Sequence, residues 1–256
     1  MPDSPVIEVC VESVDRAAAA ERGGADRIEL CQDLHSGGIT PDAELMQATR
    51  NHIRVPIHVL VRPRSGDFVY SDAEFETMKR QIRTAKELNM DGIVLGLLDE
   101  HRQIDQIRTS ILVRLAHPLP VTFHRAFDLC RSLIDSLPGV IDTGAKRILS
   151  SGGKACASDG LGCLADLVAA AGDRITIMPG GGIRANNIRS ILRETGAREV
   201  HTSVGTADQE PTFGPFEPKV VPHTLRNRKV ANFEGRVRNL RRLVQSVSYG
   251  TRPTVE

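Results

Sequence analysis

Short runs of apolar residues recur along the chain, and polar or glycine-rich segments separate them. The runs are rich in Val, Ile and Leu, and a run of this kind bounded by Gly, Pro or polar residues predicts a β-strand. The expected strands are VIEVCV (6–11), RIELC (27–31), PIHVLVR (56–62), GIVLGLL (92–98), PVTFHRAF (120–127), KRILSSG (146–152), ITIMPGGG (175–182) and REVHTSVG (198–205).

Helical patterns lie between nearly all of these runs. Ser13 is a good N-cap residue, and Asp15 falls in the first turn of the helix that follows it. In ERGGADRIELC, DTGAKRILSS and ETGAREVHTS a glycine ends the helix shortly before a strand begins, because glycine readily takes the left-handed conformation that stops a helix. The expected helices are 13–22, 71–88, 103–115, 133–142, 161–171 and 185–194, and residues 32–52 read as a long loop followed by a helix.

Strands that alternate with helices predict an α/β protein with a parallel sheet. Eight such units close naturally into a (β/α)8 TIM barrel, which is the fold class we expect. An open doubly wound sheet is the alternative, but no GxGxxG follows the first strand. We therefore expect residues 1–206 to form the barrel and residues 207–256 to form a C-terminal extension packed on the barrel or on a partner subunit.

The expected extension starts with a loop-like segment and contains a helical pattern at Asn232–Val247. Val237, Leu240, Val244 and Val247 fall on one side of that helix. We interpret its arginines as a solvated face, with contact to an anionic partner as the alternative. A non-catalytic binding scaffold that uses this tail is a further, weaker hypothesis.

Side chains alternate along a strand, so each predicted strand has two faces. One face is consistently apolar, as expected where a sheet meets its helices, and the other must face the barrel interior. Barrel interiors are normally filled by branched apolar side chains, and a buried charge is costly unless it is paired. The polar interior therefore predicts either a self-satisfied network, such as Glu8 or Glu29 with Arg62, or a working site. Its residues are Glu8, Cys10, Glu29, Cys31, His58, Arg62, His124, His201 and Ser203.

Composition narrows the classes of function. The 256 residues carry a formal net charge of +1, and only 4% are aromatic, with no Trp, so we expect no nucleic-acid partner. No apolar run reaches the roughly 18 residues of a membrane span, and the N-terminus does not resemble a secretory signal. Five cysteines without a repeating spacing indicate reduced thiols rather than a disulfide framework. We expect a cytoplasmic protein.

Polar and glycine-rich segments follow several strands, at the end of a barrel where active sites are built. Arginines there offer a fork for carboxylate or phosphate, and consecutive glycines allow backbone N–H groups to approach an anion, although a tight turn alone also explains them. No inward lysine suggests a Schiff base, and no HExxH suggests a hydrolytic zinc site. The anion-binding candidates are Arg62, Arg64, Arg125, Ser151, Gly152, Gly180, Gly181 and Gly182, and the acid–base candidates are Glu8, Glu29, His58, His124 and Asp128.

Six segments resemble, in the same order, those of the CutC copper-homeostasis family: EVCVES, ERGGADRIELC, GGITP, VRPRSGDFVYSDAEF, TFHRAFD and MPGGGIRANNI. The resemblance spans nearly all of residues 6–206 and does not cover the tail. It implies a cytoplasmic TIM barrel that forms homo-oligomers and takes part in copper handling. Copper(I) binding by strand-end cysteines, proposed for animal members, would correspond here to Cys10 and Cys31.

The chemistry of these residues is compatible with that implication. Soft thiolates prefer copper(I), and neighbouring strands lie about 4.8 Å apart. Two buried cysteines are more often inert small hydrophobes, which is the alternative. Cys130 is a candidate third thiol. Many family members have a cysteine in the segment where this chain has Val69, so a copper site that needs that thiol does not apply here.

Two hypotheses follow. The first is a cytosolic copper-homeostasis protein that binds copper(I) as its cofactor through Cys10 and Cys31, as a homo-oligomer. The second is a TIM-barrel enzyme, an isomerase or lyase, that acts on a small phosphorylated or carboxylated substrate at the C-terminal mouth of the barrel. Fold alone does not choose between them, and whether the protein is an enzyme stays open.

Overall fold

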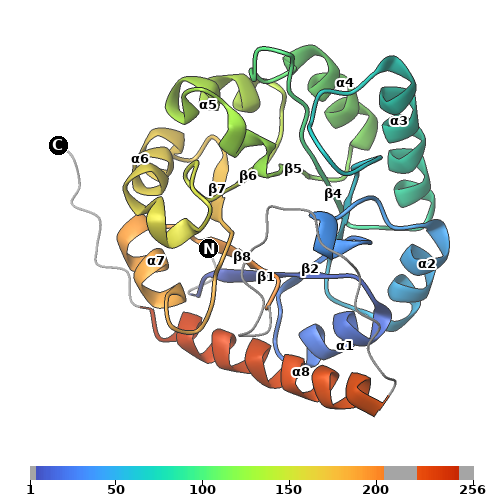
Figure 1. Cartoon of the computed structure of the whole chain (residues 1–256), viewed down its shortest axis with the longest axis vertical. Coiled ribbons are helices and arrows are strands. Elements are labelled where there is room, and N and C mark those ends of the chain that lie inside the picture. The colour runs from blue at the N-terminus through green and yellow to red at the C-terminus, as the bar shows by residue number, and fades with distance from the viewer. Residues whose placement is uncertain (1–3, 205–223, 248–256) are drawn as a thin grey trace.

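The strands of the protein run parallel in one eight-stranded sheet (Figure 1). The computed structural model describes residues 4–204 and 224–247. All eight expected strands are present, each as long as its expected run or shorter. They are β1 (Val6–Val11), β2 (Arg27–Leu30), β3 (Ile57–Leu60), β4 (Gly92–Leu95), β5 (Val121–Phe123), β6 (Arg147–Ser150), β7 (Thr176–Pro179) and β8 (Glu199–Thr202).

The sheet curves into a nearly closed barrel. From β1 to β7 each strand pairs in parallel with the next, and β1 also pairs with β8, so β7 and β8 form the two edges of the sheet. Strands β7 and β8 contact each other, which brings the two edges of the sheet together. The expected (β/α)8 TIM barrel is confirmed.

Helices surround the barrel and connect its strands (Figure 1). They begin where the sequence supplies caps: the Ser13 hydroxyl accepts a hydrogen bond from the Arg16 N–H, and Ser71 and Glu74 form a capping box. The helices are α1 (Val14–Arg22), α2 (Ala43–His52), α3 (Asp72–Glu87), α4 (Gln106–Ala116), α5 (Leu133–Asp142), α6 (Leu161–Ala171), α7 (Ile188–Thr195) and α8 (Thr224–Gln245); short 3-10 helices are η1 (Leu34–Ser36), η2 (Arg125–Leu129) and η3 (Ala157–Asp159).

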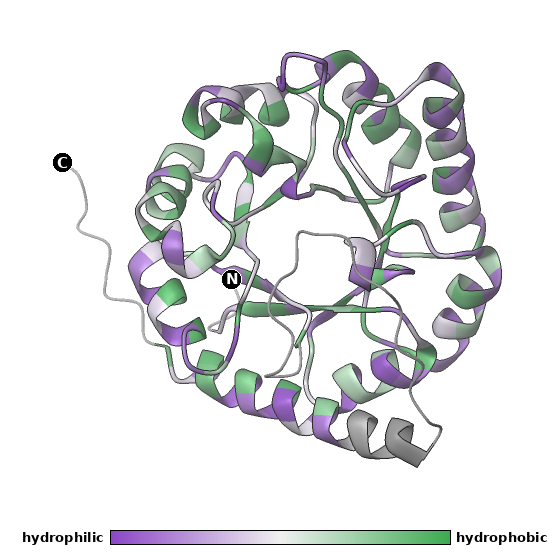
Figure 2. Ribbon diagram, in the orientation of Figure 1, coloured by the Kyte–Doolittle hydropathy of each residue, from purple (hydrophilic) through white to green (hydrophobic). Residues whose placement is uncertain are grey.

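Helix α8 lies against α1 and α7 (Figure 1). Hydrophilic and hydrophobic positions alternate along its ribbon (Figure 2), and the apolar side chains of Val237, Leu240 and Val244 are buried. Gly23 leaves the space for this contact, because a Cβ there would lie 2.6 Å from the Val237 Cβ. The helix begins before the expected residue 232. Residues 207–223 and 248–256 of the expected extension lie outside the described residues.

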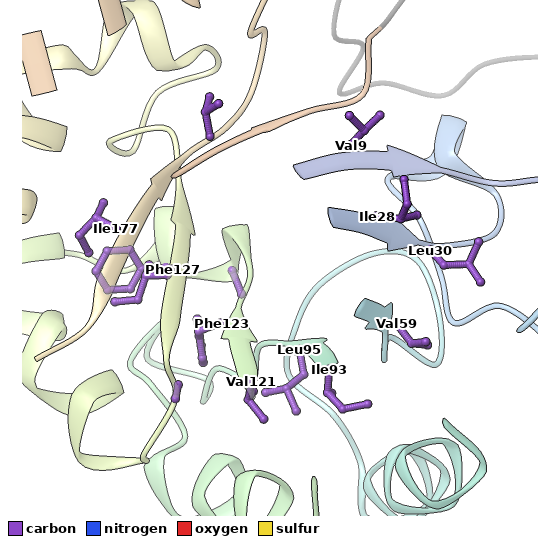
Figure 3. Packing of buried hydrophobic residues seen from close by; sticks show 14 of the residues in the cluster. Val9, Ile28, Leu30, Val59, Ile93, Leu95, Val121, Phe123, Phe127 and Ile177 are labelled. Atoms are coloured by element: carbon purple, nitrogen blue, oxygen red, sulfur yellow. The ribbon is translucent and has the colours of Figure 1, made fainter. Parts of the chain in front are cut away.

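The main hydrophobic core lies between the strands and the helices. It contains the outward-facing side chains of the strands, such as Val9, Ile28 and Val59, which Figure 3 shows together with neighbours from β4, β5 and β7. The other face of each strand points into the lumen. A second, smaller cluster of buried apolar side chains lies there: Cys10, Cys31, Leu60 and Val94.

Strand β5 ends earlier than its apolar run predicts. The run PVTFHRAF suggested a strand through Phe127, but the strand stops at Phe123 and η2 begins at Arg125. The reason is local: the His124 Nδ1 accepts a hydrogen bond from the Ala126 N–H, 3.2 Å away, and so caps the 3-10 turn. Arg125 and Asp128 therefore lie on η2 rather than on a strand.

Candidate metal centre in the barrel lumen

The lumen is polar on one side of the barrel, where β1, β2, β3 and β8 contribute acids and imidazoles. Glu8, Glu29 and His58 are all almost completely buried. Glycines of β4 and of the loop after it leave room for the rings: a Cβ on Gly92 would lie 2.4 Å from the His58 ring, and one on Gly96 would lie 2.5 Å from His124 Nδ1. The inward placement of the polar face thus agrees with the alternation of side chains along the strands.

An ion-pair network fills the lower part of the lumen. The Arg27 guanidinium donates to Glu8 from Nε and to Glu199 from Nη2, each at 2.5 Å. Arg147 Nε donates to the same Glu199 oxygen at 2.6 Å. Burial alone would raise the pKa of Glu8, but the Arg27 charge and the hydrogen bond with His201 outweigh it and hold the pKa well below its ordinary value. Glu8 is therefore an ionised, fully paired carboxylate.

The network includes three residues that the sequence pattern had not identified as candidates: Arg27, Arg147 and Glu199. A network that pairs Arg62 with Glu8 or Glu29 was one of the two alternatives for the lumen. The structure instead pairs Glu8 with Arg27, its neighbour in the register of β1 and β2. Arg27 and Glu199 each lie two residues before a predicted lumen residue, and Arg147 begins a strand. The same alternation that identified Glu29 and His201 could therefore have identified Arg27 and Glu199.

Two histidines border Glu8 with opposite pKa shifts. His201 Nδ1 lies 2.7 Å from Glu8 Oε1, whereas His58 Nδ1 lies 3.9 Å from Glu8 Oε2. Burial opposes protonation of both rings. At His201 the neighbouring Glu29 and Glu8 carboxylates outweigh burial and raise the pKa, while at His58 burial prevails and lowers the pKa to about 4. The lumen therefore holds one imidazole that favours its charged form and one that stays neutral.

The two candidate metal-binding cysteines are in contact. The Sγ atoms of Cys10 and Cys31 lie 3.5 Å apart, and Cys31 Sγ lies 3.6 Å from the Val11 carbonyl. Both side chains are buried. The hydrogen bond with Cys31, burial and the nearby Glu29 carboxylate raise the pKa of Cys10 well above its ordinary value. Without a metal, Cys10 is thus held as a thiol.

Cys10 also belongs to a cluster with Glu29 and His201. The ligand atoms that these three side chains offer all lie within 4.8 Å of one another. Burial raises the pKa of Glu29, and its Oε2 atom has no hydrogen-bond partner among the described residues. Thiol, carboxylate and imidazole donors therefore meet at one point of the lumen.

A loop covers the thiols at the mouth of the barrel. A Cβ on Gly38 would lie 2.9 Å from Leu60 Cδ2 and 3.4 Å from Cys31 Cβ, so only a glycine lets the loop approach this closely. Arg62 holds the loop from the end of β3: its Nη1 donates to the Gly38 carbonyl and its Nη2 to the Gly66 carbonyl, each at 2.8 Å. Arg62 thus lies at the mouth, as expected, and binds backbone there.

His124 lies at the mouth beside an aromatic ring. Its ring centroid is 4.8 Å from that of Phe68, and the Arg62 guanidinium lies 4.9 Å from the Phe68 centroid. Burial and the Arg62 charge lower the pKa of His124 to about 3. Its Nε2 atom finds no hydrogen-bond partner within the part of the chain that the structure describes.

Arg64 lies apart from these groups. Its Nε atom donates to Glu74 at 2.5 Å and its Nη2 atom to Asp67 at 2.9 Å. The sequence suggested that Arg64 and Arg62 form one anion-binding fork, but the two side chains reach different partners. Arg64 ties its loop to the start of α3.

Asp128 organises the loop after β6. Its Oδ2 accepts from Arg125 Nε at 2.8 Å and from the Ser151 hydroxyl at 2.9 Å, and its Oδ1 accepts from the Ser150 hydroxyl at 2.6 Å and the Gly153 N–H at 3.1 Å. Arg125 Nη2 reaches the Ser151 hydroxyl at 2.7 Å. These contacts fix the geometry of the loop.

The glycine-rich segments differ in how they use glycine. Gly152, Gly181 and Gly182 have φ of 70°, 98° and 67°, which only glycine adopts readily. Gly180 instead makes room in the lumen, because a Cβ there would lie 2.4 Å from the Leu149 side chain. A Cβ on Gly181 would lie 3.1 Å from Arg125 Nη1, which places this glycine beside the Asp128 loop.

The candidate residues thus fall into two groups. Glu8, Cys10, Glu29, Cys31 and His58 meet in the lumen, while the Asp128 loop gathers other candidates on the opposite side of the mouth. Cys130 joins neither group: it packs in the outer hydrophobic core, so the expectation of a third thiol beside Cys10 and Cys31 was wrong.

Fold and site together define a TIM barrel whose lumen holds two thiols in contact and a network of ion pairs. The model of the CutC family matches residues 5–206. The chain belongs to the CutC family, and the expectation drawn from its sequence motifs is confirmed.

Relatives and a solved structure agree with this assignment. The chain is 46% identical over 198 residues to the human copper homeostasis protein cutC homolog, covering 77% of this chain and 72% of that protein. It is 44% identical over 200 residues to a CutC family protein of Salmonella typhimurium, covering 78% and 80%. The crystal structure of a CutC protein from Streptococcus agalactiae has a TM-score of 0.75 at 32% identity and covers 78% of this chain and 98% of that one.

More distant solved structures share the fold alone. Thiamine phosphate pyrophosphorylase from Pyrococcus furiosus has a TM-score of 0.60 at 17% identity and covers 95% of this chain and 96% of its own. None of the described helices combines the length and the apolar character that crossing a membrane requires.

Proposed function

We propose that the protein binds copper(I) through Cys10 and Cys31 as its contribution to copper homeostasis. The observation that carries the proposal is the 3.5 Å separation of the two Sγ atoms at the ends of adjacent strands. Copper(I) favours soft sulfur ligands, and two thiols in contact supply them with little rearrangement of the backbone. Binding deprotonates the thiols, so affinity rises with pH.

The surroundings of the pair support the same proposal. The loop at Gly38 and the apolar side chains of Leu60 and Val94 separate both sulfurs from solvent. An apolar shell controls the access of solvent to a metal site. The proposal places the protein in the cytosol, where thiols stay reduced. It also includes assembly into a homo-oligomer, and light scattering of the purified protein would measure the number of subunits.

Titration with copper(I) against a competing chelator tests the proposal. Reduced full-length protein is expected to bind one copper(I), and the Cys10→Ser and Cys31→Ser variants are expected to lose that binding. Cys163→Ser is the matched control, because Cys163 lies on α6 outside the thiol cluster. Unchanged affinity in the double variant Cys10→Ser/Cys31→Ser would reject the site.

A second candidate function is an enzyme that acts on a small phosphorylated or carboxylated substrate. The observation that favours it is a pair of nitrogens at the mouth, His124 Nε2 and Arg62 Nε, which find no hydrogen-bond partner among the described residues and lie beside the acid–base groups of the lumen. A library of sugar phosphates and small carboxylates would test it by thermal shift. A true ligand at 100 times its Kd stabilises by about 2.7 kcal/mol, and a library without any stabilising member would count against catalysis.

A further inference from the structure

Three different donor types meet where β1, β2 and β8 run side by side. Cys10 is paired with Glu29 in the register of β1 and β2, and Glu8 is paired with His201 in the register of β1 and β8. One ligand atom from each of Cys10, Glu29 and His201 falls within a 4.8 Å group. All three residues lie on strands of the hydrogen-bonded sheet, and the sheet fixes the positions of their backbones.

Glu29 lacks, among the described residues, the ion pairs that the lumen carboxylates Glu8 and Glu199 form. It is only 6% exposed, it forms no ion pair with any described residue, and its Oε2 atom has no hydrogen-bond partner there. A buried carboxylate oxygen without a partner is costly. A cation bound beside Cys10 and His201 would satisfy this oxygen.

His201 is oriented as a metal-binding histidine usually is. Its Nδ1 is bonded to Glu8 at 2.7 Å, which leaves Nε2 as the ring nitrogen available for a metal. Glu8 is in turn held by Arg27. Metal-binding histidines commonly donate their other N–H to a carboxylate that is itself hydrogen-bonded, because this fixes the ring and raises its basicity.

The donor set differs in chemistry from the thiol pair. One sulfur, one nitrogen and one oxygen suit a borderline divalent ion such as Zn²⁺, which is often held by three protein ligands with a fourth position open. Copper(I) prefers two sulfurs instead. Cys10 belongs to both sets, whereas Cys31 belongs only to the thiol pair and Glu29 and His201 only to the mixed set.

We propose that Cys10, Glu29 and His201 form a three-ligand site for a divalent transition-metal ion, which shares Cys10 with the copper(I) pair. The two ions therefore exclude each other: copper(I) draws Cys10 toward Cys31, and a divalent ion draws it toward Glu29 and His201. The exclusion rests on the proposed copper function, whereas the divalent site does not.

The test is a titration of the reduced, full-length, metal-free protein with Zn²⁺ against a chromophoric chelator. The wild type is expected to bind one Zn²⁺. Glu29→Gln and His201→Gln are expected to lower the Zn²⁺ affinity by more than the roughly 10–100-fold that loss of an outer-shell partner costs, while their copper(I) affinity stays within a few-fold. Cys31→Ser is the matched opposite: it keeps Zn²⁺ and loses copper(I).

Co²⁺ bound to the wild type gives a readout that needs no variant. A thiolate-to-cobalt absorption band is expected to appear with one Co²⁺ and to disappear on addition of one copper(I). Wild-type protein that binds neither Zn²⁺ nor Co²⁺, or a Zn²⁺ affinity that depends on Cys31 and not on Glu29, would overturn the proposal. Zn²⁺ binding without any copper(I) binding would reject the proposed function alone, and the reverse result would reject this inference alone.

Discussion

At the residue level, the stability of the barrel depends on how each buried charge in the lumen is paired. Arg27 contacts both Glu8 and Glu199, and its side chain is 7% exposed. Because each of these carboxylates lies in a region of low dielectric, the pairing offsets a desolvation penalty of several kcal/mol for each ion. The network is therefore a condition for the fold, whatever ligand the site above it binds.

Removal of Arg27 is expected to be strongly destabilising. Arg27→Met leaves Glu8 and Glu199 without this partner and is expected to cost about 3–5 kcal/mol in the free energy of unfolding. Arg22→Met is the control, because Arg22 forms a solvent-exposed ion pair with Glu234 and pairs of that kind contribute little to stability. Urea denaturation measures both, and equal losses in the two variants would contradict the role of the network.

The buried histidines predict how stability depends on pH. The folded-state pKa of His58 is about 4 and that of His124 about 3, both below the ordinary 6.5. Between pH 6.5 and about 4 these two imidazoles are protonated in the unfolded chain but neutral in the folded chain. The free energy of unfolding therefore falls as pH falls through this window, by about 1.4 kcal/mol per pH unit for each imidazole. Their contribution is fully present above pH 6.5.

Denaturation at several pH values, together with NMR titration of the imidazoles, checks this expectation. Replacement of His124 by Gln is expected to make the slope between pH 6.5 and 4.5 shallower. A slope that His124→Gln leaves unchanged would show that burial does not keep this ring neutral.

At the scale of elements, β4 makes room for its neighbours. The strand supplies Gly92, and Gly96 follows it, where a side chain would meet the rings of His58 and His124. A typical barrel fills these inward positions with branched apolar residues. Here β4 and the residue after it have glycines at these positions, and the space they leave is filled by imidazoles from β3 and from the end of β5.

Substitution of Gly92 tests this account. Gly92→Ala would place a Cβ 2.4 Å from the His58 ring, so we expect a loss of about 1–3 kcal/mol in the free energy of unfolding through overpacking. Gly162→Ala on α6 has nothing within 4 Å of its new Cβ and is expected to be neutral or to stabilise the helix by up to about 1 kcal/mol. If both variants melt like the wild type, the lumen has more room than these contacts indicate.

At the scale of the whole molecule, the ring of helices depends on a segment outside the family match. The CutC model ends at residue 206, yet α8 covers α1 and α7 with a buried apolar face. A partly buried ion pair between Arg241 and Asp26, at 2.7 Å, also holds this helix against the barrel. We propose that the barrel and α8 form a single cooperative unit.

Shortening a side chain in the apolar face of α8 measures how much this helix contributes to the stability of the barrel. Leu240 is 3% exposed, and Leu240→Ala is expected to lower the free energy of unfolding by about 2–5 kcal/mol. Ile107→Ala on α4 is the control, because Ile107 is 77% exposed and such changes stay within about 0.5 kcal/mol. A single unfolding transition is expected in both variants. Two separate transitions would instead mean that α8 unfolds independently of the barrel.

Local sequence patterns were enough to predict the order of strands and helices and the residue types that line the lumen. Apolar runs identified all eight strands because strand formation depends on local periodicity. The alternation of side chains placed Glu8, Cys10 and Glu29 on the inner face for the same reason. Strand ends were less well predicted, since His124 ends β5 through a cap that periodicity does not register.

Which of these residues contact one another depends on the three-dimensional fold. The stagger of β1 against β2 selected Arg27 rather than Arg62 as the partner of Glu8, and it brought Cys10 within 3.5 Å of Cys31. The closure of the barrel placed His201, from the last strand, beside Glu29, from the second. Register and closure depend on contacts between segments far apart in the chain, so the local pattern of the sequence could supply the donors of the site but not their grouping.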